Sequence, residues 1–121
     1  MTDVKVLIVD DEEELVTTLV ERLRWRGLQA TAALSGPAAL EKMREERYDV
    51  AVIDLKMPGM DGLALRDLIL REFPDVRVLL ATGHGRESEG DEPGLTGAQD
   101  VLLKPFSIDV LIDRLNQPPD K

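Results

Sequence analysis

The chain contains no cysteine and a single histidine, His84. Without cysteine it can build neither a disulfide framework nor a thiolate metal site. One imidazole is too few for a multi-histidine metal centre and leaves little for Ser-His-Asp catalysis. These absences exclude several classes of site and leave the carboxylates as the groups best able to carry chemistry.

Long apolar runs and positive charge are also scarce. The apolar stretches, such as residues 4–9 with one lysine among them and residues 51–53, are far shorter than the ~20 residues of a membrane helix, and the first residues lack the basic segment of a secretory signal. Lysine and arginine total 15 against 24 acidic residues, which gives a net charge of −9. Such a charge repels nucleic acid phosphates and anionic membrane surfaces. We therefore expect a cytoplasmic protein without direct contact to nucleic acid or membrane.

The sequence does contain enough apolar material for one compact domain. It has 121 residues, of which 43% are apolar, and a chain of this length normally folds as one unit. We expect a single domain over residues 1–121, with a core over about 4–116 and a flexible tail over 117–121, where two prolines lie.

Short apolar segments alternate along the chain with segments of helical periodicity. Strands are predicted at residues 4–9, 28–34, 48–54, 76–81 and 101–103. Helices are predicted between them and after the last, where capping or turn residues precede apolar residues three and four apart. Ser35 and Ser107 are the expected N-caps of the second and the last helix, and Asp61-Gly62 is expected to form a turn at the start of the third. This alternation predicts an α/β fold: a five-stranded parallel sheet in the doubly wound, flavodoxin-like order 2-1-3-4-5, with helices on both faces.

The first predicted helix, residues 12–26, carries an apolar stripe that includes Leu15, Val16 and Leu19, and Gly27 follows it as a C-cap. Trp25 lies on the side of the helix away from this stripe. We expect its indole to pack partly against the frayed helix end, with a partner contact as the alternative.

Polar residues stand at the carboxyl ends of four of the five predicted strands. Asp10 and Asp11 follow the first strand, Asp54 ends the third, Thr82 follows the fourth and Lys104 the fifth. In open parallel sheets the binding crevice lies at these strand ends. We expect the five side chains to converge there.

Three carboxylates in one crevice repel one another by roughly 3 kcal/mol per pair at ~5 Å in an effective dielectric of ~20, unless a cation offsets them. Oxygen ligands of this kind suit Mg²⁺ or Mn²⁺. A carboxylate beside such an ion can attack a phosphoryl group, while a lysine ammonium and a hydroxyl neutralise the phosphoryl oxygens. Asp54, Lys104 and Thr82 fit these three roles.

Four short motifs occur in order along the chain: VLIVDDE at residues 6–12, DLKMPGMDG at 54–62, TGHG at 82–85 and KPF at 104–106. Together they resemble the receiver domain of bacterial two-component response regulators, over about residues 4–116. The resemblance implies a signalling phosphoacceptor that is not an enzyme, although it assists its own phosphotransfer and slow dephosphorylation. It would receive a phosphoryl group on Asp54 from the phosphohistidine of a sensor histidine kinase or phosphotransfer protein. It would then act on an output partner that the sequence does not identify.

The resemblance also implies a ligand set for the metal. Asp11 and Asp54 would bind Mg²⁺ directly, Asp10 would bind it through water, and the main-chain carbonyl of Lys56 would complete the protein ligands. The side chain of Lys56, two residues after the acceptor, could also influence how long the phosphoryl group persists, although a solvated loop residue is an equal alternative.

Phosphoryl contacts are implied for Lys104, Thr82 and Gly83, with a Lys104-Pro105 bond that is usually cis in the family. His84, two residues after Thr82, is a second possible modulator of phosphoryl lifetime, again with a solvated loop residue as the alternative.

Two features depart from the family pattern. Residues 86–96, where the family has its fourth helix, contain two glycines, a proline and one large apolar residue, so we expect a short or disordered helix there. Val101 stands where family members often carry a switch aromatic. We therefore expect output through ordering of residues 86–96 in place of rotation of a ring.

Other classes of protein fit the sequence less well. A haloacid dehalogenase-type phosphatase needs a D-x-D pattern after the first strand, where this chain has Asp10-Asp11-Glu12, and the glycine-rich nucleotide-binding motifs are absent. The alternative that stays open is a receiver-like module that binds partners without being phosphorylated. The complete set of polar residues at the strand ends argues against it.

Overall fold

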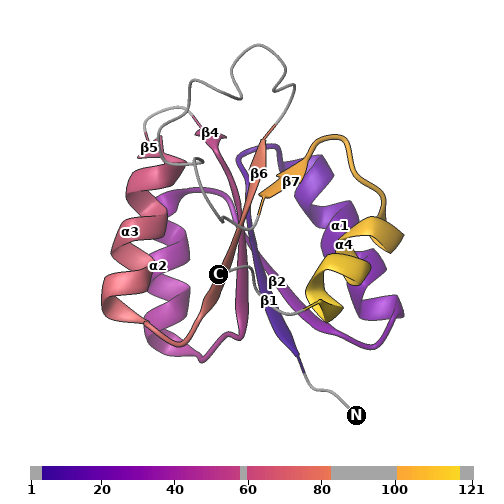
Figure 1. The fold of residues 1–121 in the computed structure, drawn as a ribbon, viewed down its shortest axis with the longest axis horizontal. Helices are drawn as coiled ribbons and strands as arrows, with labels where there is room; N and C mark the ends of the chain where they lie inside the picture. The colour runs from indigo at the N-terminus through magenta and orange to yellow at the C-terminus, as the bar shows by residue number, and fades with distance from the viewer. Residues whose placement is uncertain (1–3, 58–59, 83–100, 118–121) are drawn as a thin grey trace.

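Five parallel strands form the centre of the computed structural model, which describes residues 4–57, 60–82 and 101–117 (Figure 1). The strands are β1 (Lys5–Val9), β2 (Gln29–Ala33), β3 (Val50–Asp54), β6 (Arg77–Thr82) and β7 (Val101–Leu103), and they lie in the order β2-β1-β3-β6-β7. This is the doubly wound order 2-1-3-4-5. The predicted sheet is confirmed, with strand ends within two residues of their predicted positions.

Helices cover both faces of the sheet, as predicted. On one face lie α1 (Glu13–Trp25) and α4 (Ile108–Asn116), and on the other lie α2 (Gly36–Glu45) and α3 (Gly62–Glu72) (Figure 1). The fourth helix expected within residues 86–96 falls outside the described residues. No helix in the part of the chain that the structure describes has the length and apolar character to cross a membrane.

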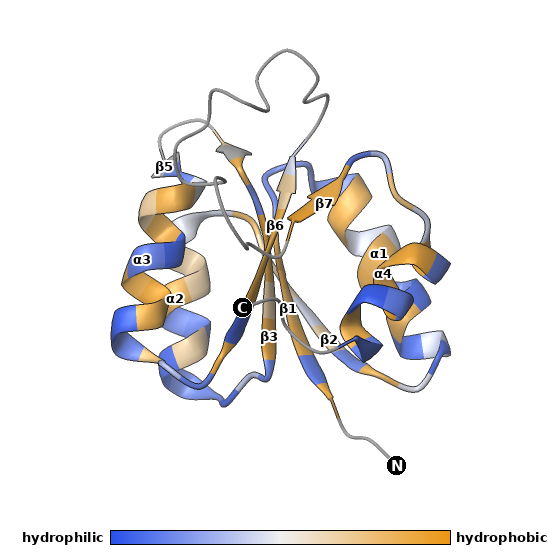
Figure 2. Ribbon diagram, viewed as in Figure 1, coloured by the Kyte–Doolittle hydropathy of each residue, from blue (hydrophilic) through white to orange (hydrophobic). Residues whose placement is uncertain are grey.

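The alternation of buried side chains along β1 shows why both faces are covered. Leu7 and Val9 join the core beneath α2 and α3, whereas Val6 and Ile8 join the core beneath α1 and α4, and all four are buried. Figure 2 shows the strands largely in the orange of apolar residues, while the helices alternate between orange and blue. A strand that is apolar on both faces needs a helix layer on each side.

Capping residues set most of the helix ends. Ser35, Asp61 and Ser107 each accept a hydrogen bond from a backbone N–H of the first turn of α2, α3 and α4. Gly27 takes a φ of 91° after α1, and its N–H and that of the next residue donate to carbonyls of the last helical turn. The predicted cap residues are therefore confirmed at Ser35, Ser107 and Gly27.

Two side chains of α1 are more exposed than expected. Trp25 is 76% exposed, because it lies opposite the buried stripe and the chain turns away at Gly27. Leu15 is 37% exposed, because it lies at the edge of the stripe while Val16 and Leu19 fill its centre. The structure also contains a small antiparallel pair that was not predicted, β4 (Lys56–Met57) with β5 (Met60–Asp61).

Candidate functional site

Three polar side chains are buried at the carboxyl end of the sheet. Asp10 follows β1, Asp54 ends β3 and Thr82 ends β6, and, counted over the whole residue, they are only 4%, 7% and 6% exposed. These three strands are neighbours in the sheet, so their ends lie side by side. Among the described residues, no other polar or charged side chain is buried to this degree. Because polar groups lose solvation on burial, such a concentration marks a functional site.

The carboxylates of Asp10, Asp11 and Asp54 form a compact acidic cluster. One oxygen from each lies within 4.8 Å of the others, and Asp11 is exposed whereas the other two are buried. The cluster therefore opens toward solvent on one side. Three hard oxygen donors with access for water match the coordination that Mg²⁺ favours in proteins. The prediction that these carboxylates converge is confirmed in the geometry.

Lys104 brings a positive charge to the same crevice. Its Nζ lies 3.1 Å from Asp10 Oδ2 and 3.6 Å from Asp54 Oδ1, and the side chain is 20% exposed. Its backbone N–H donates to the carbonyl of Thr82 at 2.8 Å, which ties the loop after β7 to the end of β6. The Lys104-Pro105 peptide bond is cis, as the family resemblance implies.

The charged form of Lys104 is stabilised, although its side chain is partly buried. Burial has the largest single effect and lowers the pKa of Lys104. The hydrogen bond to Asp10 and the negative charges of Asp10, Asp54 and Glu12 together raise the pKa by more than burial lowers it. The net result is a pKa above the ordinary lysine value. Lys104 is therefore a fixed cation between two buried carboxylates at neutral pH.

Backbone hydrogen bonds orient Asp10. Its N–H donates to the carbonyl of Ala33 at 3.1 Å, and its Oδ1 accepts from the N–H of Glu12 at 3.0 Å. The second bond occupies one carboxylate oxygen, while the other faces Lys104. Asp10 is thus held by the start of α1 and the end of β2.

Gly62 allows α3 to pack directly on the segment that follows Asp54. A Cβ atom at Gly62 would lie 2.7 Å from Leu55 Cα, closer than real Cβ atoms come to backbone, and 3.0 Å from the carbonyl oxygen of Asp54. The Gly62 N–H donates to the Leu55 carbonyl at 3.2 Å. This role of Gly62 was not predicted, because Asp61-Gly62 is also a typical turn and was expected to form only that. The signal that could have indicated it is the place of Gly62 at the end of the motif that begins with Asp54.

Some predicted site residues have less structural support. The backbone of Lys56 lies in β4, close after Asp54 in the chain. Gly83 and His84 lie outside the described residues, as does the segment 86–96. Val101, where an aromatic was expected in the family, is partly buried in β7 and pairs with Leu80 of β6.

Comparison with known proteins identifies the family. The sequence pattern of the response regulator receiver domain matches residues 6–116, nearly the whole chain. The chain belongs to this family. It is therefore a signalling domain of the two-component type, and its acidic cluster fits phosphorylation and Mg²⁺ binding.

Two curated response regulators show how similar the chain is to known members of the family. The chain is 32% identical over 112 residues to the heme response regulator HssR of Staphylococcus aureus, covering 93% of this chain and 50% of HssR. It is 38% identical over 109 residues to the response regulator protein FleR of Pseudomonas aeruginosa, covering 90% of this chain and 23% of FleR. The chain thus spans half or less of these relatives.

Among solved structures, the response regulator protein TrrA of Thermotoga maritima in complex with Mg(2+)-BeF superposes with a TM-score of 0.79. The two share 28% sequence identity, and the match covers 93% of this chain and 96% of TrrA. The receiver fold therefore extends over nearly the full length of both.

Proposed function

We propose that this receiver domain is a phosphoacceptor switch in which Asp54 accepts a phosphoryl group from the phosphohistidine of a sensor histidine kinase or phosphotransfer protein. One observation carries the proposal: the Lys104 ammonium lies 3.1 Å from Asp10 and 3.6 Å from Asp54 in the buried crevice. A cation held there can balance the charge that a phosphoryl group would add.

In the proposed reaction, a carboxylate oxygen of Asp54 attacks phosphorus and the phosphorus–nitrogen bond of the phosphohistidine breaks. The imidazole nitrogen leaves with the bonding electrons, and Asp54 becomes an acyl phosphate. Lys104 and the hydroxyl of Thr82 would hold the phosphoryl oxygens, together with the backbone of Gly83. Slow hydrolysis of the acyl phosphate would return the carboxylate, so the domain signals and does not turn over a separate substrate.

The acidic cluster is the proposed site of Mg²⁺, or of Mn²⁺ in its place. Asp11 and Asp54 would bind the ion directly, Asp10 would bind it through water, and the carbonyl of Lys56 would complete the set. Such an ion, when bound, neutralises carboxylate and phosphoryl charge. The donor chemistry supports this assignment, because all three carboxylates offer hard oxygens within 4.8 Å of one another.

A labelling experiment tests the acceptor. The chain is treated with acetyl phosphate, with and without Mg²⁺, and analysed by intact mass and phosphate-affinity electrophoresis. One phosphoryl group is expected in the presence of the ion and none in Asp54→Asn. Asp113→Asn removes an exposed carboxylate far along the chain, in α4, and serves as the matched control that keeps full labelling. Undiminished labelling of Asp54→Asn would refute the assignment of the acceptor.

The same labelled protein tests the proposed modulators of phosphoryl lifetime. If the side chains of Lys56 and His84 limit the approach of water, Lys56→Ala and His84→Ala should change the decay of the acyl phosphate several-fold without abolishing labelling. Equal decay in both variants and in the unaltered chain would leave them as solvated loop residues.

A further inference from the structure

The C-terminal turn of α1 presents an aromatic side chain to solvent. Trp25 is 76% exposed, more than any other large apolar side chain among the described residues, and it is the one tryptophan in the sequence. Tryptophan is usually buried for most of its surface, and where it is exposed it often anchors a protein interface. Its position opposite the buried stripe of α1 leaves most of the ring in contact with solvent.

Arginines flank this tryptophan in a chain whose net charge is −9. Arg22 lies one helical turn before Trp25, and Arg26 follows it. Both arginines are exposed, and Arg26 shares its charge with the exposed Asp109 at 2.8 Å. We call Arg22, Trp25 and Arg26 the arginine–tryptophan turn. Its surface combines one large apolar ring with two cations, of which Asp109 balances Arg26, and exposed Glu21 lies one helical turn before the ring.

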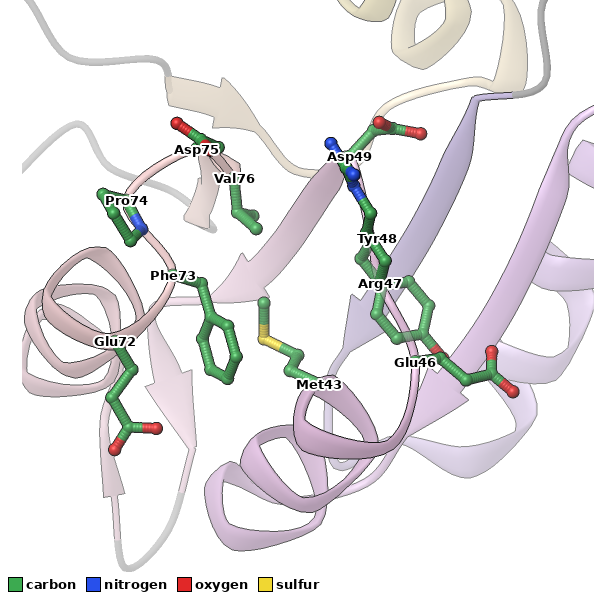
Figure 3. Close-up of a pocket in the computed structure, with 10 residues that line it drawn as sticks. All are labelled: Met43, Glu46, Arg47, Tyr48, Asp49, Glu72, Phe73, Pro74, Asp75 and Val76. Carbon is green, nitrogen blue, oxygen red and sulfur yellow. The ribbon is translucent and has the colours of Figure 1, made fainter.

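A pocket of about 290 Å³ lies between the C-terminal ends of α2 and α3 (Figure 3). Its floor is apolar: Figure 3 shows the side chains of Met43, Phe73 and Val76 turned toward one another, with the ring of Tyr48 beside them. Pockets for drug-sized ligands begin at roughly 300 Å³. The size of this pocket therefore suits one large side chain better than an extended ligand.

The rim of the pocket is strongly acidic. It carries Glu46, Asp49, Glu72 and Asp75 against a single cation, Arg47. Glu46 and Glu72 already form ion pairs with Lys5 and Arg44, at 2.7 and 3.1 Å. Asp49 and Asp75 take part in neither of these pairs and keep the rim acidic, so it favours an occupant that is apolar and flanked by cations.

The fold places the turn and the pocket at the same end of the molecule. Each helix runs antiparallel to the parallel strands, so the C-terminal ends of α1, α2 and α3 all lie beside the N-terminal ends of the strands (Figure 1). The turn lies on one face of the sheet and the pocket on the other. With this placement, a two-fold rotation that sets these ends of two copies against each other can put each turn opposite the other copy's pocket.

We propose that this end of the domain is a self-association surface. In a symmetric dimer, Trp25 of each copy enters the pocket of the other, and Arg22 and Arg26 face its acidic rim. The contact is isologous, so it closes at two copies and does not propagate. It lies at the end of the sheet away from Asp54 and needs no phosphoryl group. Its test is therefore independent of the proposed phosphoacceptor function.

Because Trp25 is the one tryptophan in the sequence, its fluorescence reports directly on the proposed contact. Sedimentation equilibrium and tryptophan emission are recorded from micromolar to millimolar concentrations of the unphosphorylated chain. We expect the mass to rise from monomer to dimer while the emission moves to shorter wavelength and becomes less accessible to acrylamide. Trp25→Ala should stay monomeric. Leu103→Ala removes another exposed apolar side chain, 61% exposed on β7, and should associate like the unaltered chain.

Charge changes at the rim test the pairing of turn and pocket. Asp75→Arg and Arg22→Glu should each weaken association about tenfold or more, whereas Arg47→Glu should strengthen it several-fold. A mixture of Trp25→Ala, which keeps the pocket, with Asp75→Arg, which keeps the turn, can form one intact contact. The mixture should therefore associate more strongly than either variant alone.

Two results would overturn the proposal. One is a monomer mass with unshifted emission up to millimolar concentration. The other is association that persists in Trp25→Ala with its circular dichroism and urea midpoint unchanged. Should Trp25→Ala fail to fold, Arg22→Glu and Arg47→Glu decide alone, because equal association in both contradicts a pocket with an acidic rim.

Discussion

The two ends of the sheet each hold a lysine between carboxylates, but the carboxylates differ in exposure. At the N-terminal end, Lys5 pairs at 2.7 Å with Glu46, whose side chain is 53% exposed. At the C-terminal end, Lys104 faces the side chains of Asp10 and Asp54, which are 6% and 9% exposed. Both lysines have raised pKa values, and burial opposes the rise in both: at Lys5 the hydrogen bond to Glu46 is the largest effect, whereas at Lys104 burial is the largest single effect.

The difference shows which end has been shaped by something other than stability. An exposed ion pair adds little to the free energy of unfolding and is easily replaced. Buried carboxylates cost solvation that a single lysine offsets only in part, so apolar side chains would serve stability better. The C-terminal end therefore keeps charges that folding alone does not need.

The largest expected effect is at Gly62, beside the acceptor segment. Gly62→Ala places a Cβ 2.7 Å from Leu55 Cα, so either α3 or the segment after Asp54 must move. We expect a loss of about 2–3 kcal/mol in the free energy of unfolding, measured in urea, together with slower labelling by acetyl phosphate. Unchanged stability and labelling would show that the close packing of α3 has no role in the site.

Gly27→Ala is the matched change at the other end of the sheet. Its φ of 91° strains any side chain, although nothing lies within 4 Å of the added Cβ. The expected loss is about 1 kcal/mol, with labelling unaffected. The two glycines together separate backbone strain from damage to the site.

Lys104→Met removes the cation from the crevice and leaves two buried carboxylates close together. We expect the metal-free protein to lose about 1–2 kcal/mol of stability, a modest value because the lysine is partly open to solvent. Mg²⁺ should stabilise this variant more than the unaltered chain, since the ion replaces the missing charge. Equal stabilisation of the two by Mg²⁺, seen as shifts in the urea midpoint, would contradict the placement of the ion at these carboxylates.

The stability difference between the unaltered chain and Lys104→Met should depend on pH in one direction. The folded pKa of Lys104 lies above its ordinary value of 10.5, so its stabilising contribution is complete below pH 10.5. The contribution disappears as the pH rises through the folded pKa. Urea unfolding from neutral to strongly alkaline pH should therefore show a constant difference that shrinks only above about pH 10.5.

The smallest effect is expected at Glu46. Glu46→Gln breaks the ion pair with Lys5 while keeping the shape of the side chain, and no measurable change in the urea midpoint is expected at neutral pH. A loss comparable to that of Lys104→Met would remove the contrast between the two ends of the sheet.

The fold and most of the crevice could be predicted because their signals are local. Apolar strands end in Asp10, Asp54 and Thr82, and parallel pairing brings such ends together regardless of what lies between them. Ser35 and Ser107 cap the helices through bonds to residues three positions away. Each of these features depends on a few neighbouring residues.

The features that were missed depend on surfaces from distant segments. Gly62 matters because α3 touches the segment after Asp54, a contact that periodicity does not reveal. The pocket joins residues 43–49 with residues 72–76, and no pattern in either segment indicates the other. Spacing places Trp25 away from the apolar stripe of α1, but how much of its ring is exposed also depends on where the chain goes after Gly27. Propensity and spacing do not predict which distant segments of the chain come into contact.

The crevice is held in shape largely by main-chain atoms. The N–H groups of Asp10, Leu55 and Lys104 donate to carbonyls of neighbouring segments at 3.1, 2.8 and 2.8 Å. Bonds of this kind persist whatever side chains the accepting residues carry. The sequence around the crevice can therefore drift over evolutionary time while the reactive groups keep their positions. A chain only 28% identical to TrrA can accordingly keep the same fold with a TM-score of 0.79.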